Sequence, residues 1–266
     1  MVLCRPKAVL EYIQCTFGIT CIALPADTEL FYSINKKIFT FAQNHFMTSL
    51  AEENYLKAIY KLHEKTGAMV TTSALAETLK VSAASVTDFI KKIAAKKLVS
   101  YEKSKGVKLT EKGRLIAVSI IRKHRLWEVW LVKKLAFKWD EVHEIAEQLE
   151  HVISDELIDH LDGHLGYPTT DPHGDTIPDA KGHFAKTNSK PLLECAEGDK
   201  VKFIGVNEHS NSFLQYLTKS NLHLGDEIVV ESIEEFDNTF SVKVNKKENK
   251  TFSKEVVKNL LVAVAR

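Results

Sequence analysis

The chain has 266 residues with 36 basic and 35 acidic side chains, a net charge of +1 that excludes a wholly basic coat protein. Its 44% hydrophobic and 27% charged content is ordinary for a soluble globular protein, and its length allows about two or three small domains. No apolar run approaches the roughly 18 residues of a membrane span. The four cysteines are sparse and form no CxxC pair, which favours a reducing, cytoplasmic setting.

Residues 1–46 differ from the rest of the chain. They hold three of the four cysteines, few charges and no sustained periodicity. Met47 then opens MTSLAEENYLKAIYKLHEK, an amphipathic helix in which Ser49 and Glu52 predict a capping box. We expect the folded protein to begin near Met47, with residues 1–46 an N-terminal extension that is disordered or outside the native protein. A targeting segment is the alternative, although no secretory signal pattern is present.

Residues 47–113 predict a winged helix-turn-helix. Within TTSALAETLKVSAASVTDFIKKIAAKKLVSYEKSKGVKLTEKG, Thr71 or Thr72 can cap a short helix, and a turn at Val81 and Ser82 leads to a second helix. The run LVSYEKSKGVKLT then predicts two strands joined by a turn at Lys105–Gly106.

Positive charge gathers on this module. Residues 80–108 contain eight lysines against Asp88 and Glu102, a net charge of +6. This density predicts DNA binding, with protein interaction as the alternative use of such a module. Small side chains early in the second helix can reach base edges, whereas lysines contact phosphates. The expected DNA contacts are Ser82, Ala84, Ser85, Thr87, Lys91, Lys92, Lys103 and Lys105.

The stretch HEIAEQLEH, from His143 to His151, raises the possibility of metal binding. On a continuous helix, His143, Glu147, Glu150 and His151 share one stripe roughly 100° wide. A charged outer face and a set of metal ligands explain this stripe equally well. The opposite side is expected to be the core face and carries Val142, Ile145, Leu149, Val152 and Ile153.

A second pair of candidate ligands lies on the preceding helix. In IIRKHRLWEVWLVKKL, His124 and Glu128 are four residues apart and face the same way. Antiparallel packing of two long helices would bring both sets together. We therefore expect a helical domain over 114–180 that can bring these candidate metal ligands together. Its candidate dimer seam is VISDELIDHLDGHLGY, with intramolecular core as the alternative.

The C-terminal part has a different periodicity. PTTDPHGDTIPD reads as a turn-rich connector, and 181–191 reads as a linker. From residue 192, DKVKFIGV, DEIVVESI and FSVKVNK predict strands, with a helix SFLQYLTKS between the first two. The expected fold is mainly α and multidomain, ending in a small β-barrel-like domain over 192–266.

These blocks resemble a known family. ENYLKAIYKL, the winged helix, RKHRLWEVWL, VHEIAEQLEHVISDEL and DPHGDTIPD are similar, in this order, to the diphtheria-toxin-repressor (DtxR/MntR) family of metal-dependent transcriptional repressors. Residues 192–266 resemble its small third domain, of the FeoA type. Residues 1–46 match nothing in the family.

The resemblance implies two metal sites. Its primary site falls on Asn54, Glu147, Glu150 and His151. Its ancillary site falls on His124, Glu128 and His143, completed by Glu208 or His209, and in two-metal manganese members His124 joins the primary cluster instead.

Two residues depart from the family pattern. Asn54 stands where an aspartate or methionine is usual, and Lys57 stands where some manganese members carry a second glutamate. A lysine there would repel a second cation. Iron-type members have a cysteine at the position of Glu147, so the sulfur-free set here favours Mn²⁺ over Fe²⁺.

The predicted function is that of a Mn²⁺- or Fe²⁺-dependent transcriptional repressor. It would bind palindromic DNA operators as a homodimer in the cytoplasm and control metal-ion uptake genes, without enzymatic activity. One alternative is a winged-helix regulator that ignores metal. The other is a metalloenzyme, because histidine and glutamate clusters can activate water.

Overall fold

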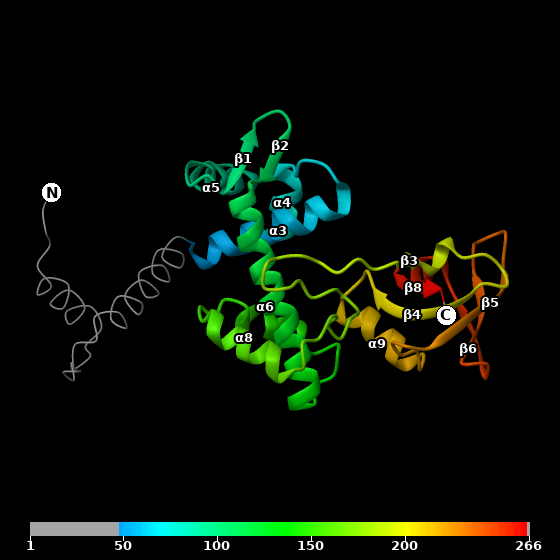
Figure 1. The fold of residues 1–266 in the computed structure, drawn as a ribbon. Coiled ribbons are helices and arrows are strands. Elements are labelled where there is room, and N and C mark those ends of the chain that lie inside the picture. The colour runs from blue at the N-terminus through cyan, green and yellow to red at the C-terminus, as the bar shows by residue number, and fades with distance from the viewer. Residues whose placement is uncertain (1–47, 265–266) are drawn as a thin grey trace, which may run out of the picture. The chain divides into compact units, whose positions relative to one another are not determined.

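The computed structural model describes residues 48–264, so the expected extension over 1–46 lies outside the described residues. Elements are labelled as in Figure 1. The described chain combines a winged helix-turn-helix, a helical region and a C-terminal six-stranded sheet. With that sheet and a second, two-stranded one, the expectation of a mainly α protein is not confirmed.

The first module has the predicted order of elements. Ser49 forms the predicted capping box with Glu52, and Thr71, one of two predicted alternatives, caps α4. Ser82, which was predicted to lie in the turn, caps α5. The elements are α3 (Leu50–Thr66), α4 (Thr72–Leu79), α5 (Ala83–Ala95), β1 (Val99–Glu102) and β2 (Gly106–Leu109). Leu56, Ile59, Leu75 and Ile90 are fully buried in its core, which fixes α5 against the rest of the module.

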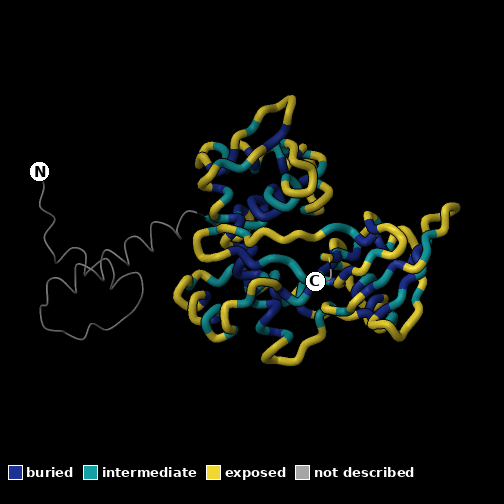
Figure 2. The backbone as a smooth tube through the Cα atoms, turned by 45° about the vertical axis from the view of Figure 1, so that its right-hand side comes forward, coloured by how far each residue is buried: buried dark blue, intermediate teal, exposed yellow. Residues whose placement is uncertain are grey.

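The two strands of the wing are antiparallel, with Val99 opposite Leu109. The tip of the hairpin is exposed (Figure 2), whereas Val99, Gly106 and Val107 of its strands are buried. Gly106 allows this arrangement because it has a φ of 115° and lies against the main chain of Val70.

The helical region differs from expectation in two respects, the length of α7 and the face of α7 that is buried. α6 (Glu111–Leu135) is long, and α8 (Asp155–His164) is capped by Ser154. Between them, α7 (His143–Leu149) has only seven residues and ends at Glu150. The expected continuous helix through His151 is therefore wrong.

The expected core face of α7 is also wrong. Glu150 is fully buried, whereas Ile153 is 55% exposed. Val142 and Ala146 are buried, but Ile145, Leu149 and Val152 are only partly covered. The polar stripe faces the protein interior because ion pairs offset the cost of burying it.

The candidate dimer seam on α8 divides into two parts. Leu161 is buried and Leu165 partly so, in a cluster that also contains Leu126 of α6 and partly buried Trp127 and Trp130. Ile153 and Leu157 remain exposed. The dimer seam stays a prediction, carried by these exposed residues.

The C-terminal sheet has strand order β3-β8-β4-β5-β6-β7. Its strands are β3 (Lys190–Pro191), β4 (Lys200–Val206), β5 (Glu227–Ile233), β6 (Phe240–Val244), β7 (Glu248–Phe252) and β8 (Leu260–Val264). A short 3₁₀ helix (Leu192–Glu194), α9 (Asn211–Lys219) and α10 (Lys254–Val257) complete the domain. β3 and β7 end the order and are not paired with each other in the described chain, so barrel closure is not confirmed. Among the described residues, no helix is long and apolar enough to cross a membrane.

Alanine at Gly106 should destabilise the wing. Its Cβ would lie 2.4 Å from the Val70 carbonyl oxygen, and its φ is positive. Gly67 also has a positive φ, of 67°, but nothing lies within 4 Å of its Cβ position. We expect Gly67→Ala to cost about 1–2 kcal/mol of unfolding free energy and Gly106→Ala clearly more. Urea unfolding of both variants measures this, and equal losses would contradict the close approach.

Candidate metal centre and nucleic-acid interface

A buried imidazole, His124 of α6, lies at the middle of a polar network. Its Nε2 is 3.0 Å from Glu128 Oε1 and 3.2 Å from His143 Nδ1. His143 Nδ1 is itself 3.3 Å from Glu128 Oε1. Three potential ligand atoms thus lie within 4.8 Å of one another. The i,i+4 spacing on α6 and the first residue of α7 create this triangle.

The connector after α8 adds two more groups. His173 Nδ1 is 3.5 Å from Glu128 Oε2, and Asp171 lies in the same cluster. Asp171 Oδ1 accepts hydrogen bonds from the main-chain N–H groups of His173 and Asp175, so the aspartate shapes the turn that carries His173. We call His124, Glu128, His143, Asp171 and His173 the histidine cluster.

The third domain contributes His209, which precedes α9. Its ring lies 5.2 Å from the His173 ring, edge to face. Its loop is positioned by the main chain: Val206 N–H donates to the His173 carbonyl, and a Cβ on Gly174 would lie 2.1 Å from the Ile204 carbonyl oxygen. Glu208 is exposed and accepts from the Ser210 N–H. Of the two expected third-domain residues, only His209 therefore approaches the cluster.

The other nitrogen of His124 faces a second group of charges. His124 Nδ1 is 2.6 Å from Glu150 Oε2. Lys57 of α3 extends its Nζ to within 2.6 Å of Glu147 Oε1 and 2.5 Å of Glu150 Oε2. We call Lys57, His124, Glu147 and Glu150 the lysine cluster. It joins α3 of the winged helix to α6 and α7.

Two expected ligands of the primary site lie at its edge. His151 Nδ1 is 2.7 Å from Glu53 Oε2 of α3, and its Nε2 is 3.6 Å from Glu150 Oε1. Asn54 is partly buried, but no contact between its amide and either cluster is recorded among the described residues. The α3 side chains that do reach this region are Glu53 and Lys57.

Burial and neighbouring charges shift the pKa values of several residues in the histidine cluster. Burial opposes ionisation of Glu128, but hydrogen bonds with His124, His143 and His173 outweigh it and hold the Glu128 pKa well below its usual value. Burial would lower the pKa of His173, yet contact with Glu128 raises it to about 9. Burial and the charge of Glu128 raise the pKa of Asp171 to about 7. A metal ion would replace protons held at these positions.

The donor set fits a divalent metal ion. A cavity of about 20 Å³, lined by Asp171 and Asp175 of the connector and by four histidines, lies at the centre of the histidine cluster and admits about one water-sized group. His209 Nε2 and Glu150 Oε1 are buried and lack a hydrogen-bond partner. Unsatisfied buried polar atoms are rare, and one borders each cluster. Nitrogen and carboxylate ligands suit manganese, iron and zinc.

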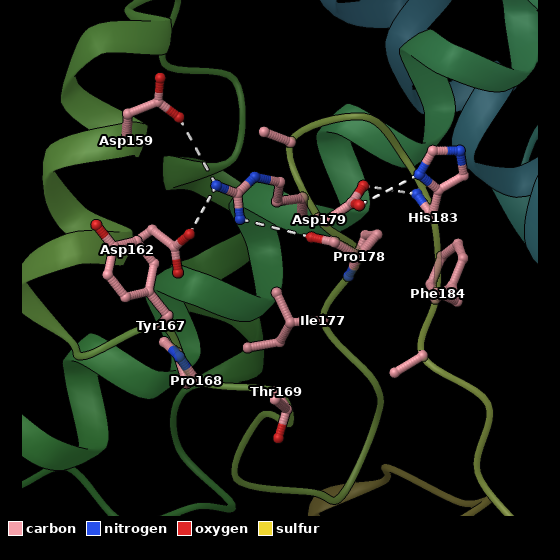
Figure 3. A pocket seen from close by; sticks show the side chains of 13 residues that line it. Asp159, Asp162, Tyr167, Pro168, Thr169, Ile177, Pro178, Asp179, His183 and Phe184 are labelled. Carbon is pink, nitrogen blue, oxygen red and sulfur yellow. Dashed lines mark hydrogen bonds and ion pairs between the residues drawn. The ribbon is translucent and has the colours of Figure 1, made fainter.

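A larger hollow of about 610 Å³ lies elsewhere, beside α8 (Figure 3). There Arg122 pairs with Asp162 at 2.9 Å and with Asp159 at 3.7 Å. Arg122 Nη1 also donates to the Pro178 carbonyl, at 3.5 Å. The charge of Arg122 is paired with carboxylates inside this hollow. The large volume of the hollow therefore does not identify it as the functional site.

The residues expected to contact DNA lie on α5, including its N-cap, and in the hairpin of the wing. Ser82, Ala84 and Ser85 are exposed at the start of α5, and Thr87 is partly covered, with its hydroxyl donating to the Ala83 carbonyl. The expected lysine contacts are all exposed: Lys91, Lys92, Lys103 and Lys105. Lys91 and Lys105 pair with acidic residues of their own module, Asp88 and Glu102.

Comparison with known proteins gives matches over most of the described chain. Residues 47–107 match the model "Iron dependent repressor, N-terminal DNA binding domain", and residues 110–179 match "Iron dependent repressor, metal binding and dimerisation domain". Residues 190–264 match the FeoA domain. A solved structure, a manganese-dependent transcriptional repressor in complex with manganese, superposes with a TM-score of 0.73 at 33% identity. The match covers 80% of this chain and 100% of that one.

The chain belongs to the diphtheria-toxin-repressor family.

Two curated relatives match parts of the chain. The iron-dependent repressor IdeR of Mycobacterium tuberculosis is 37% identical over 126 residues, which are 47% of this chain and 54% of that protein. A helix-turn-helix regulator of Methanocaldococcus jannaschii is 35% identical over 109 residues, which are 41% of this chain and 87% of that protein. The match thus spans about half the length of the iron-dependent repressor.

Sequence reasoning missed the connector residues Asp171 and His173. Both stand in DPHGD, whose composition is typical of a turn. A histidine and an aspartate two residues apart beside a candidate site could have suggested ligands. The position of Lys57 among the carboxylates was missed as well, although its charge was noted.

Metal should stabilise the folded protein through the histidine cluster. At about 100 times its Kd, Mn²⁺ should add about 2.7 kcal/mol to the unfolding free energy. Glu128→Gln should remove most of this gain, and His209→Ala should reduce it. Glu208→Gln is the matched control and should retain it. Thermal unfolding with chelator and with Mn²⁺ tests this, and an undiminished gain in Glu128→Gln would rule out the histidine cluster.

Proposed function

We propose that this protein is a metal-dependent transcriptional repressor that binds palindromic operators as a homodimer and controls metal-ion uptake genes. The observation that carries the proposal is the convergence of side chains from the winged helix, the helical region, the connector and the third domain on one buried polar network. Family membership and the basic surface of the winged helix support it.

The proposed ligands of the histidine cluster are His124 Nε2, Glu128, His143, Asp171 and His173, with His209 from the third domain. A divalent ion would supply the positive charge and directional bonds that join these groups. Glu150 would accept the Nδ1 proton of His124 and so fix the tautomer that presents Nε2. The proposed ligands of the lysine cluster are Glu147, Glu150 and His151.

This arrangement would couple metal to DNA through geometry. α3 belongs to the DNA-binding module and contacts α7 through Lys57, while α6 runs from the wing to α8 (Figure 1). Fixing α6 and α7 would therefore fix the angle of the winged helix. In a symmetric dimer, that angle sets the spacing of the two recognition helices on an operator.

Manganese is the preferred metal and iron the alternative. Both clusters contain only nitrogen and oxygen donors, and Cys195, the one cysteine in the described chain, is buried in the third-domain core. Hard donors without sulfur suit Mn²⁺ and tolerate Fe²⁺. Zn²⁺ is expected to bind in vitro, because affinity generally rises along this series of metals.

The proposed function predicts that DNA binding requires metal. Fluorescence anisotropy of the chain on DNA upstream of its own gene and of neighbouring transporter genes would be recorded at one fixed salt concentration. We expect affinity to rise about 5–150-fold from chelator to Mn²⁺ or anaerobic Fe²⁺. Equal affinity with chelator and metal would leave a winged-helix regulator that ignores metal.

The lysines of the winged helix should act mainly on phosphates. Lys92→Ala and Lys103→Ala should weaken binding about equally on all sequences and lower the slope of log affinity against log salt by about 1 each. Lys247→Ala, an exposed lysine of the third domain, is the matched control and should leave the slope unchanged. Unchanged slopes in all three variants would move the DNA contact away from α5 and the wing.

A further inference from the structure

Lys57 occupies an unusual position for a lysine. Its side chain is only 7% exposed, and its Nζ lies between two carboxylates, Glu147 and fully buried Glu150. The same Nζ is 3.5 Å from His124 Nδ1. The ammonium therefore has the three neighbours that would otherwise surround a metal ion, because His124, Glu147 and Glu150 also form one of the groups able to hold a cation.

We propose that Lys57 is a resident cation of the lysine cluster, which a metal must displace from Glu147 and Glu150, so that this cluster fills only after the histidine cluster. The proposal rests on the proposed function for the choice of metal. It concerns the order in which the two clusters bind metal and the affinity of each cluster. Both follow from the geometry of the clusters.

Electrostatics gives the reason for competition. A monovalent ammonium within 2.6 Å of both carboxylates neutralises part of the charge that would attract a divalent ion. A metal that binds these oxygens leaves the Lys57 ammonium without its partners in a buried position, which is costly. Metal binding must therefore offset the removal of Lys57 as well as the dehydration of the ion.

In the described part of the chain, no lysine or arginine forms an ion pair with Glu128, the central carboxylate of the histidine cluster. The two carboxylates and three imidazoles of this cluster face one another across the small cavity, and Arg125 approaches only Asp171, at 3.6 Å, and Asp175. Lysines 57 and 61 line the wall of this cavity, but Lys57 is committed to Glu147 and Glu150. A metal entering here displaces protons and leaves the ion pairs of Lys57 intact.

Access differs as well. Glu147 is 40% exposed, whereas Glu150 is fully buried. An ion can therefore meet Glu147 from solvent, but it can bind Glu147 Oε1 and Glu150 Oε2 together only by replacing the ammonium that lies between them. Partial binding at Glu147 alone would be weak, because a single exposed carboxylate holds a divalent ion poorly.

Calorimetric titration of the metal-free full chain with Mn²⁺, without DNA, tests the proposal. We expect two steps in the wild type, the tighter lost in Glu128→Gln and the weaker lost in Glu147→Gln. Lys57→Met should strengthen the weaker step by about tenfold or more, the effect of removing a close competing charge. Lys57→Arg retains the charge and should keep the weaker step within about threefold of the wild type.

Lys61→Met is the matched control, since Lys61 lies one helical turn further along α3 and makes no ion pair with either carboxylate in the described chain. It should change the weaker step less than Lys57→Met does. Lys57→Gln is a second variant for the case that methionine prevents folding. In chelator, both Lys57 variants should unfold at lower temperature than the wild type, and Mn²⁺ should restore the loss.

An unchanged weaker step in Lys57→Met and Lys57→Gln would overturn the proposal, as would a tighter step that Glu147→Gln removes. No binding of Mn²⁺ to the wild type would instead contradict the proposed function. The two failures are therefore distinguishable in one set of titrations.

Discussion

The two clusters depend on one imidazole, His124. A neutral imidazole carries a proton on only one nitrogen, and here one nitrogen is 2.6 Å from Glu150 while the other is 3.0 Å from Glu128. A ligand that takes Nε2 fixes the proton on Nδ1, where Glu150 accepts it. A change at Glu150 conversely alters the basicity of Nε2. Because the ring is buried, solvent cannot compensate for either change. The clusters are thus chemically one unit.

Burying so many charges is tolerable only because each has a partner. Glu128 and Glu150 are almost or fully inaccessible, and Lys57 is nearly so. Isolated ions in such places would cost several kcal/mol each. The partners come from segments far apart in sequence: Lys57 and Glu150 are separated by 93 residues, and Glu53 and His151 by 98. The polar network therefore adds to the apolar cores, which cross between modules at only a few positions: Ala117 of α6 belongs to the winged-helix core, and Trp139 packs against the third-domain core.

The features that depend only on neighbouring residues were predicted from the sequence. The capping box of Ser49, the turn before α5 and the wing were read from neighbouring residues and are confirmed. The length of α7 was not predictable, because nothing between His143 and His151 breaks a helix; tertiary ion pairs to α3 decide where it ends. The role of Asp171 and His173 was hidden by the turn composition of DPHGD. Only the fold reveals that this turn lies beside Glu128.

The position of the third domain follows from main-chain contacts more than from side-chain affinity. His173 uses its ring nitrogens for Glu128 and the Trp139 carbonyl, while its own carbonyl accepts from Val206 N–H at the end of β4. Trp139 in turn donates from its indole to Thr218 of α9. One residue is therefore held from both sides, by the polar cluster through its ring and by the sheet through its backbone. His173 thus links Glu128 to the end of β4, three residues before His209. Because such coupling is reciprocal, docking of the third domain and occupation of the histidine cluster must strengthen or weaken each other together.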